Sequence, residues 1–214
     1  MVAALEERFG EPTVDAPDDL IGSFVRTILS QNTTDANAWP AYDRLVETFG
    51  SWEAVAEAKP SSIAEPIRSA GLANVKAPRI RDFVRWVKDR FDDYDLSALR
   101  RMPDGEIIET MLAVKGIGIK TVAVVMLFSL DRDVFPVDTH VHRICRRVGL
   151  VPDKATAEQT YRLMAPLVPP GASLSLHVNL LRLGRTICDA RNPRCPECPL
   201  RARCAFAQKD REGE

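Results

Sequence analysis

Apolar side chains recur every three or four residues along most of this chain, which is the spacing of an amphipathic helix. The pattern predicts helices over residues 20–29 and 41–49, with Asp18 and Asp19 in the first turn of the former and Gly50 ending the latter. Two more helices are predicted over residues 60–70 and 75–91. Residues 121–130 are rich in valine and would also suit a buried strand, but their length and the glycine turn before them favour a buried helix. We therefore expect an all-α protein.

Composition and charge narrow the class of protein. The chain has 214 residues, of which 45% are hydrophobic, and no apolar run approaches the roughly 18 residues of a membrane span. Its first ten residues already include Glu6, Glu7 and Arg8 and form no apolar signal, so we expect a cytoplasmic protein that does not enter membranes. The formal net charge is −1, yet residues 182–204 hold six Arg against two acids. Positive charge gathered in this way suits a nucleic-acid partner.

Four of the five cysteines lie close together near the C-terminus, at Cys188, Cys195, Cys198 and Cys204. Their C-x6-C-x2-C-x5-C spacing fits two disulfides, a zinc ion or an iron–sulfur cluster. A reducing cytosol disfavours disulfides, and zinc sites usually present two C-x2-C pairs where this chain has one. Four thiolates are the usual ligand set of a [4Fe–4S] cluster, so the cluster is the favoured interpretation. The fifth cysteine, Cys145, is expected to be a buried core thiol.

A glycine-rich turn separates two predicted helices within residues 104–130. It reads Lys115-Gly116-Ile117-Gly118-Ile119-Lys120-Thr121. Glycines permit a positive φ and leave no side chain over the backbone, so the first amides of the second helix can meet an anion such as a DNA phosphate. Taken alone, such a turn is more often plain architecture. The spacing to lysine excludes a Walker loop, and the lack of a preceding strand excludes a dinucleotide fingerprint.

Lys120 and Asp138 are the two candidates for chemistry. Lys120 falls in the first turn of a predicted helix, where the helix dipole disfavours a cation. It is either a solvated lysine that contacts phosphate or an amine held ready to act as a nucleophile. Asp138 lies in Val137-Asp138-Thr139-His140 and is a natural N-cap for a helix over 139–148. A cap and a catalytic carboxylate are compatible roles.

The chain carries the glycine-rich hairpin, the Val-Asp-Thr-His segment and the four spaced cysteines in this order. Together they resemble the endonuclease III family of helix-hairpin-helix DNA glycosylases, and the resemblance runs from about Leu20 to Cys204. The hairpin at 114–122 matches the family's L-P-G-V-G-x-K-T-A pattern, although Lys115 stands where the pattern has Pro. The V-D-T-H segment is present unchanged at 137–140, and the cysteine spacing matches in full.

The resemblance implies residue roles. Lys120 takes the place of the catalytic lysine and Asp138 that of the catalytic aspartate. Gln31 matches the residue that enters the gap left by an extruded base, and Leu72, in Gly71-Leu72-Ala73-Asn74, matches the wedge into the duplex. Without the family match, Gln31 would be a polar residue at a helix end and Leu72 an ordinary loop contact. Further DNA contacts are expected at Lys115, Gly116, Gly118, His140, Arg191 and Arg194.

The resemblance also implies an architecture and a function. A helical barrel lobe is expected over 18–130, and an iron–sulfur lobe over 1–17 with 131–214, with the cluster loop at 188–204. Lys120 and Asp138 would face each other across the cleft between the lobes. The expected function is a bifunctional DNA glycosylase and abasic-site lyase that removes oxidised pyrimidines from double-stranded DNA, acting as a nucleoid-associated monomer with a [4Fe–4S] cluster. The alternatives are a monofunctional glycosylase of a sister branch and a non-catalytic helix-hairpin-helix DNA-binding protein.

Overall fold

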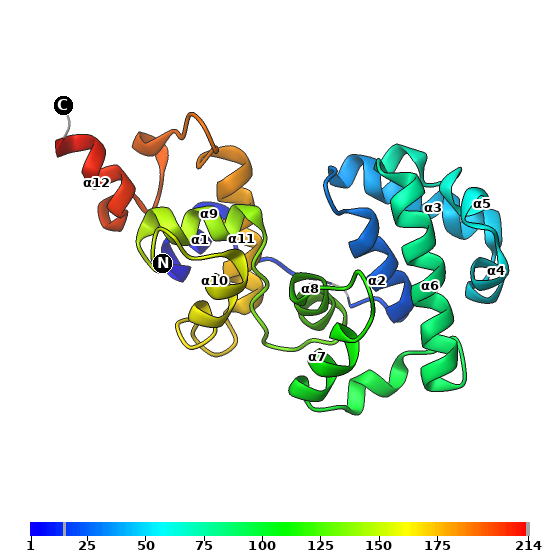
Figure 1. The fold of residues 1–214 in the computed structure, drawn as a ribbon. Coiled ribbons are helices and arrows are strands. Elements are labelled where there is room, and N and C mark those ends of the chain that lie inside the picture. The colour runs from blue at the N-terminus through cyan, green and yellow to red at the C-terminus, as the bar shows by residue number, and fades with distance from the viewer. Residues whose placement is uncertain (15, 213–214) are drawn as a thin grey trace. The chain divides into compact units, whose positions relative to one another are not determined.

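The described part of the chain is built from helices alone. The computed structural model describes residues 1–14 and 16–212, and within them it contains α-helices and short 3-10 helices but no strand (Figure 1). The all-α prediction is confirmed. Across the same residues, no helix is both long enough and apolar enough to cross a membrane.

The chain divides into two compact units. One unit comprises Ala16–Val125, and we call it the hairpin unit. The other combines the N-terminal segment with Met126 and the residues after it, and we call it the cysteine unit. The division falls at Val125, inside a helix, whereas the sequence predicts it after Leu130.

The hairpin unit is formed by one long helix and several shorter ones. These are α2 (Leu20–Leu29), α3 (Asp35–Phe49), α4 (Trp52–Glu57), α5 (Pro60–Ala64), η1 (Arg68–Ala70), α6 (Ala73–Phe91), η2 (Ser97–Arg101), α7 (Asp104–Leu112) and the start of α8 (Ile119–Ser129). Phe24 of α2 and Phe83 of α6 pack in the core, with ring centroids 5.3 Å apart. Asp19 is the N-cap of α2 and accepts a hydrogen bond from Gly22 N at 2.9 Å. It therefore lies just before the first turn of the helix, and the prediction that it lies within that turn is wrong.

The valine-rich segment is a buried helix, as predicted. It forms most of α8, where Val122, Ala123, Val125 and Met126 are buried. A helix covered on nearly all sides needs no polar face, which is why its sequence lacks the amphipathic pattern of its neighbours.

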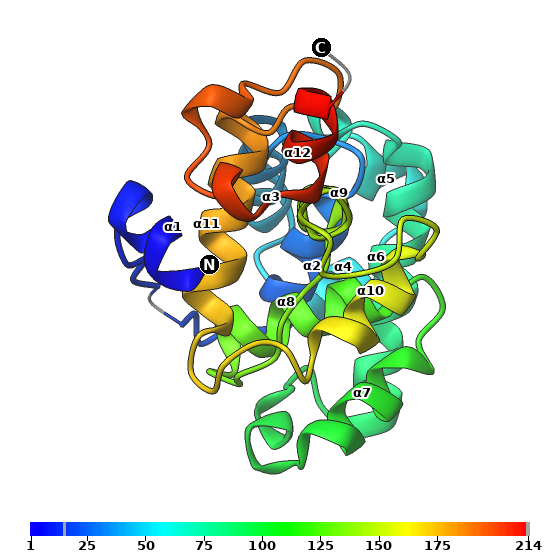
Figure 2. The same cartoon turned by 90° about the vertical axis from the view of Figure 1, so that its left-hand side faces the viewer.

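The cysteine unit joins both ends of the chain. Its helices are α1 (Val2–Phe9), α9 (Thr139–Val148), α10 (Ala157–Met164), α11 (Ser173–Thr186), η3 (Cys195–Glu197), η4 (Arg201–Arg203) and α12 (Ala205–Glu212). Helix α1 lies beside α11 (Figure 2). Ser175 Oγ donates to Glu6 Oε1 at 2.6 Å, and Asn179 Nδ2 donates to Gly10 O at 3.0 Å. These bonds attach the N-terminal helix to the helix that leads to the first clustered cysteine.

Candidate functional site

The turn between α7 and α8 is a short hairpin whose backbone can be followed in green in Figure 1. Gly116 has a φ of +90°, a conformation that side chains rarely adopt, whereas Gly118 does not use a positive φ. A Cβ added at Gly118 would meet no atom within 4 Å. Ile117 anchors the turn in the core, and Thr121 N donates to Gly118 O at 2.9 Å to begin α8. Gly116 is thus required by the turn itself, and Gly118 leaves the backbone open to an outside partner.

The two hairpin lysines occupy different places. Lys115 is exposed in the turn, and Lys120 is half-buried in the first turn of α8. The first amides of any helix lack intrahelical acceptors and carry partial positive charge. An anion such as a phosphate is therefore favoured beside Lys120.

Gln31 reaches the same helix from a distant part of the sequence. It follows α2, and its Nε2 donates to Thr121 Oγ1 at 3.4 Å. Thr121 is the direct neighbour of Lys120 in the chain. The structure therefore brings two of the residues predicted from the sequence, Gln31 and Lys120, to one place within the hairpin unit.

Leu72 stands out by its backbone and its exposure. It is the N-cap of α6 with φ 52° and ψ 31°, the left-handed region, and 57% of it is exposed. A bulky residue in this region is a true outlier, because its Cβ lies close to its own carbonyl oxygen. An exposed, strained leucine contributes little to folding and suits a side chain that is presented to a partner.

Sequence reasoning missed Lys76. Its side chain is only 2% exposed, and its Nζ donates to Leu29 O at 2.7 Å and to Ala70 O at 2.8 Å. Burial lowers the pKa of this ammonium. A signal was available, since Lys76 lies four residues before Ile80 on the apolar stripe of α6.

Asp138 is the N-cap of α9, as predicted. Its Oδ1 accepts a hydrogen bond from Val141 N at 2.8 Å, and the residue is partly exposed. The segment before it is fixed by His177, whose Nδ1 lies 2.9 Å from Pro136 O. Lys120 belongs to the hairpin unit, whereas Asp138 belongs to the cysteine unit.

The predicted DNA-contacting residues of the cysteine unit have different surroundings. His140 is partly buried, with its Nδ1 3.2 Å from a guanidinium nitrogen of Arg143. Arg191 is exposed. Arg194 bonds within its own loop, donating to Glu197 Oε2 at 2.9 Å and to Thr186 O. Arg191 and Arg194 are both exposed, whereas His140 is partly buried.

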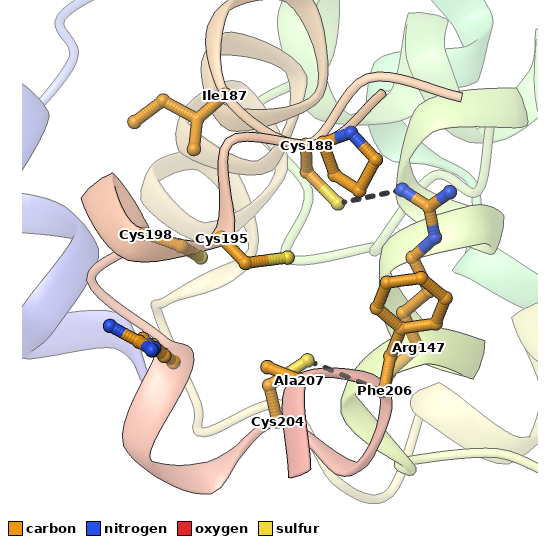
Figure 3. Close-up of a pocket in the computed structure, with 10 residues that line it drawn as sticks. Arg147, Ile187, Cys188, Cys195, Cys198, Cys204, Phe206 and Ala207 are labelled. Carbon is orange, nitrogen blue, oxygen red and sulfur yellow. Dashed lines mark hydrogen bonds between the residues drawn. The ribbon is translucent and has the colours of Figure 1, made fainter. Parts of the chain in front are cut away.

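The four clustered cysteines surround one cavity (Figure 3). None of the four forms a disulfide. Burial raises the pKa of the Cys198 thiol, and negative charge on the other three cysteines raises it further. The thiols are therefore close enough to repel one another as thiolates, and a bound cationic group would relieve that repulsion.

Arg147 of α9 closes one side of this cavity. It donates to Cys188 Sγ at 3.2 Å and to Asp189 O at 2.6 Å, and its guanidinium lies 4.8 Å from the ring centroid of Phe206. Cys145 is on the same helix but lies in the core of the unit, where burial raises its pKa to about 12. The prediction of Cys145 as a buried core thiol is confirmed.

The four thiols around the cysteine cavity are candidate ligands of a metal centre. Over the part of the chain that the structure describes, no three His, Cys, Asp or Glu side chains are grouped to hold a single ion. Zinc binds thiolates at about 2.3 Å and so draws four sulfurs tightly together. A cluster of four irons and four sulfides carries four cysteine ligands around a wider core, which suits four thiols spread around one cavity.

One family model, several relatives and several solved structures are similar to this chain. Residues 25–170 match the family model described as HhH-GPD superfamily base excision DNA repair protein. The chain is 32% identical to endonuclease III of Thermotoga maritima, over 89% of this chain and 84% of that protein. It is 31% identical to endonuclease III of Sulfolobus acidocaldarius, over 88% and 82%. A solved structure of a trapped endonuclease III–DNA covalent intermediate matches 98% of this chain and 95% of its own with a TM-score of 0.83, at 23% identity.

Proposed function

Since this chain belongs to the endonuclease III family of the HhH-GPD superfamily of base excision DNA repair proteins, and is a DNA glycosylase and abasic-site lyase, we propose that it removes oxidised pyrimidines such as thymine glycol. Its substrate is double-stranded DNA with a damaged or abasic nucleotide. The observation that carries the proposal is the hydrogen bond from Gln31 to Thr121. It sets a candidate gap-filling side chain beside a lysine at the open end of a helix.

The nucleotide must first leave the duplex, because its C1′ cannot be reached inside the stack. Extrusion costs a few kcal/mol of lost stacking and pairing. In our proposal, Leu72 enters the duplex as an apolar wedge and Gln31 fills the vacancy left by the base. The left-handed backbone of Leu72 supports this role, since it projects an apolar side chain into solvent.

Lys120 then acts as the nucleophile. Its neutral amine bonds to C1′, the N-glycosidic bond breaks, and the base departs with the bonding electrons and takes up a proton. Positive charge builds on the sugar in this step, and Asp138 stabilises it. Asp138 also accepts the proton that the attacking amine loses.

Strand cleavage follows from the same adduct. The sugar ring opens to give a protonated Schiff base between Lys120 and C1′. This iminium draws electrons from C2′, which loses a proton, and the C3′–O bond breaks so that the phosphate leaves by β-elimination. Water then hydrolyses the imine and restores the lysine.

Binding of the DNA backbone is assigned to the helix N-terminus and to nearby cations. Amides at Gly116 and Gly118, with the ammonium of Lys115, approach phosphate oxygens in this proposal. His140, Arg191 and Arg194 make the corresponding contacts from the cysteine unit. The protein acts as a monomer in association with the nucleoid.

A [4Fe–4S] cluster held by the four clustered cysteines completes the cysteine unit. When bound, it ties residues 188–204 together and supplies no step of the reaction. Arg147 donates to Cys188 Sγ and to the carbonyl that follows it, so it orients one thiolate for this role. Iron analysis and an absorption band at about 400 nm test whether the four cysteines hold an iron–sulfur cluster, and a colourless protein that contains zinc would overturn that assignment.

Borohydride trapping tests the catalytic assignment. With an oligonucleotide duplex that contains an abasic site or thymine glycol, the native protein should form a covalent adduct. Lys120→Ala should form none, and Lys115→Ala, which removes the other amine of the same hairpin, should retain it. An adduct that survives Lys120→Ala and disappears with Lys115→Ala would reassign the nucleophile. Base release by the native protein without any adduct would assign it to the monofunctional class.

A further inference from the structure

Lys76 is a buried cation that the proposed reaction does not use. Its neighbours on the same face of α6, Ile80, Phe83 and Val87, are apolar core residues. Burying an ammonium is unfavourable unless partners compensate for the lost water, and a methionine would fill the same space without that penalty. Packing alone therefore does not explain a lysine at this position.

The two acceptors of Lys76 explain it better. Leu29 is the last residue of α2, and Ala70 is the last residue of η1. Carbonyls at helix C-termini lack intrahelical donors and carry partial negative charge, so one ammonium satisfies both. Gln31 follows two residues after Leu29, and Leu72 follows two residues after Ala70. A single amine thus holds the starting points of both loops that carry the proposed duplex-entering side chains.

Both loops contain a residue of positive φ two or three positions after these carbonyls. Asn32 has a φ of 56° and Leu72 a φ of 52°, and neither is glycine. Such conformations persist only where the surroundings hold them. The backbone N–H of residue 76 also donates to Leu72 O at 2.9 Å, but this is the first intrahelical bond of α6 and does not depend on the lysine side chain. By contrast, the bond from Gln31 to Thr121 is long, at 3.4 Å, and does not by itself fix the main chain.

We propose that Lys76 is a positioning residue that holds Gln31 and Leu72 at a set separation, so that both enter one gap in the duplex. The inference rests on the proposed function, because it assumes that these two side chains enter DNA. Without the amine, the carbonyls at the end of α2 and the end of η1 lose the one donor that they share. Leu72 can then relax to an ordinary backbone conformation and withdraw from the position of a wedge.

Strand intrusion can be measured without any chemistry at Lys120. The probe is a duplex with 2-aminopurine opposite a tetrahydrofuran abasic analogue, which cannot form a Schiff base. 2-Aminopurine brightens when it is unstacked, so its fluorescence gain at saturating protein reports intrusion independently of affinity. We expect Lys76→Met to reduce this gain at least about threefold. The double variant with Leu72→Ala should show no smaller gain than Leu72→Ala alone, because both changes act through one wedge.

Lys88→Met is the matched control. It makes the same substitution on the same helix, at an exposed lysine whose Nζ donates to Asp92 O at 3.0 Å, and it should keep the full gain. If Lys76→Met does not fold, Lys76→Gln replaces it, since the amide keeps two donors, and an intermediate gain is expected. A native gain in either folded variant, or effects of Lys76 and Leu72 that multiply, would overturn the inference. No effect of Leu72→Ala would instead show that the wedge assignment is wrong.

Discussion

The capping role of Asp138 and its proposed catalytic role can be separated by two substitutions. In the structure, Oδ1 of Asp138 accepts a hydrogen bond from Val141 N at 2.8 Å at the start of α9. Asparagine keeps an oxygen in this position and caps helices about as well as aspartate, so Asp138→Asn should change stability by only a few tenths of a kcal/mol. Asp138→Ala removes the cap and should cost about 1 kcal/mol. For a chain of this length, that corresponds to a melting temperature lower by about 2–4 °C.

Asp138→Asn and Asp138→Ala should differ in stability but not in activity. Both variants lack the negative charge that, in our proposal, stabilises the developing cation on the sugar. Removing one such electrostatic group typically lowers the rate by about 10²–10³, or about 3–4 kcal/mol. Asp138→Asn and Asp138→Ala should therefore lose activity to a similar extent although their stabilities differ.

The assay pairs two measurements on the same preparations. Single-turnover base release from a thymine glycol duplex gives the rate, and urea unfolding gives the free energy of unfolding. Thr156→Ala is the control for cap loss, because Thr156 caps α10 of the same unit through a bond to Gln159 N at 3.1 Å. It should lose about 1 kcal/mol of stability and keep its rate. A near-native rate in Asp138→Asn would refute the catalytic role and leave Asp138 as a cap alone.

Three further predictions concern single residues. Gly116→Ala should cost about 1–2 kcal/mol in urea unfolding, because φ is +90° and the new Cβ would lie 3.3 Å from Arg79 Cδ; an unchanged midpoint would contradict the turn geometry. Leu72→Gly should raise stability by about 0.5–1 kcal/mol while it reduces strand intrusion, and a destabilised variant would contradict the strain argument. Burial, and then the charge of Arg146, lower the pKa of His142 below its ordinary 6.5, so the unfolded chain binds this proton more readily and stability falls as pH drops below 6.5. His142→Gln should therefore lose less stability than the native protein between about pH 7 and about pH 5, as urea midpoints would show.

Local rules predict several helices correctly, although residues 60–70 form α5 and the separate η1 instead of the single helix that was expected. Gly50 ends α3 in the left-handed conformation that its position after an apolar stripe predicts. Asp138 caps α9, and the valine-rich run became α8 because its length and preceding turn outweigh strand propensity. These predictions succeed because each depends on residues within one or two turns of one another.

Contacts between distant segments could not be predicted in this way. Lys76 was identifiable as a polar residue on an apolar stripe, but its acceptors Leu29 and Ala70 follow only from the packing of α6 against α2 and η1. The bond from Arg147 to Cys188 likewise joins α9 to a loop far along the chain. The family resemblance alone predicts that Gln31 and Leu72 enter DNA. The structure adds the hydrogen bond of Gln31 to Thr121 and the left-handed backbone of Leu72, which sequence patterns do not show.

Some residues that disfavour folding are residues that the proposed function uses. Leu72 exposes an apolar side chain on a strained backbone, and Lys76 buries a charge where methionine would fit. Gly118 directly precedes α8 and stands where an added Cβ would meet no other atom within 4 Å. In our proposal, Leu72 serves as the wedge, Lys76 holds the wedge in place, and Gly118 leaves the backbone open to phosphate. Local conflict with folding rules is therefore a signal of function at Leu72 and Lys76, which the motifs alone do not explain.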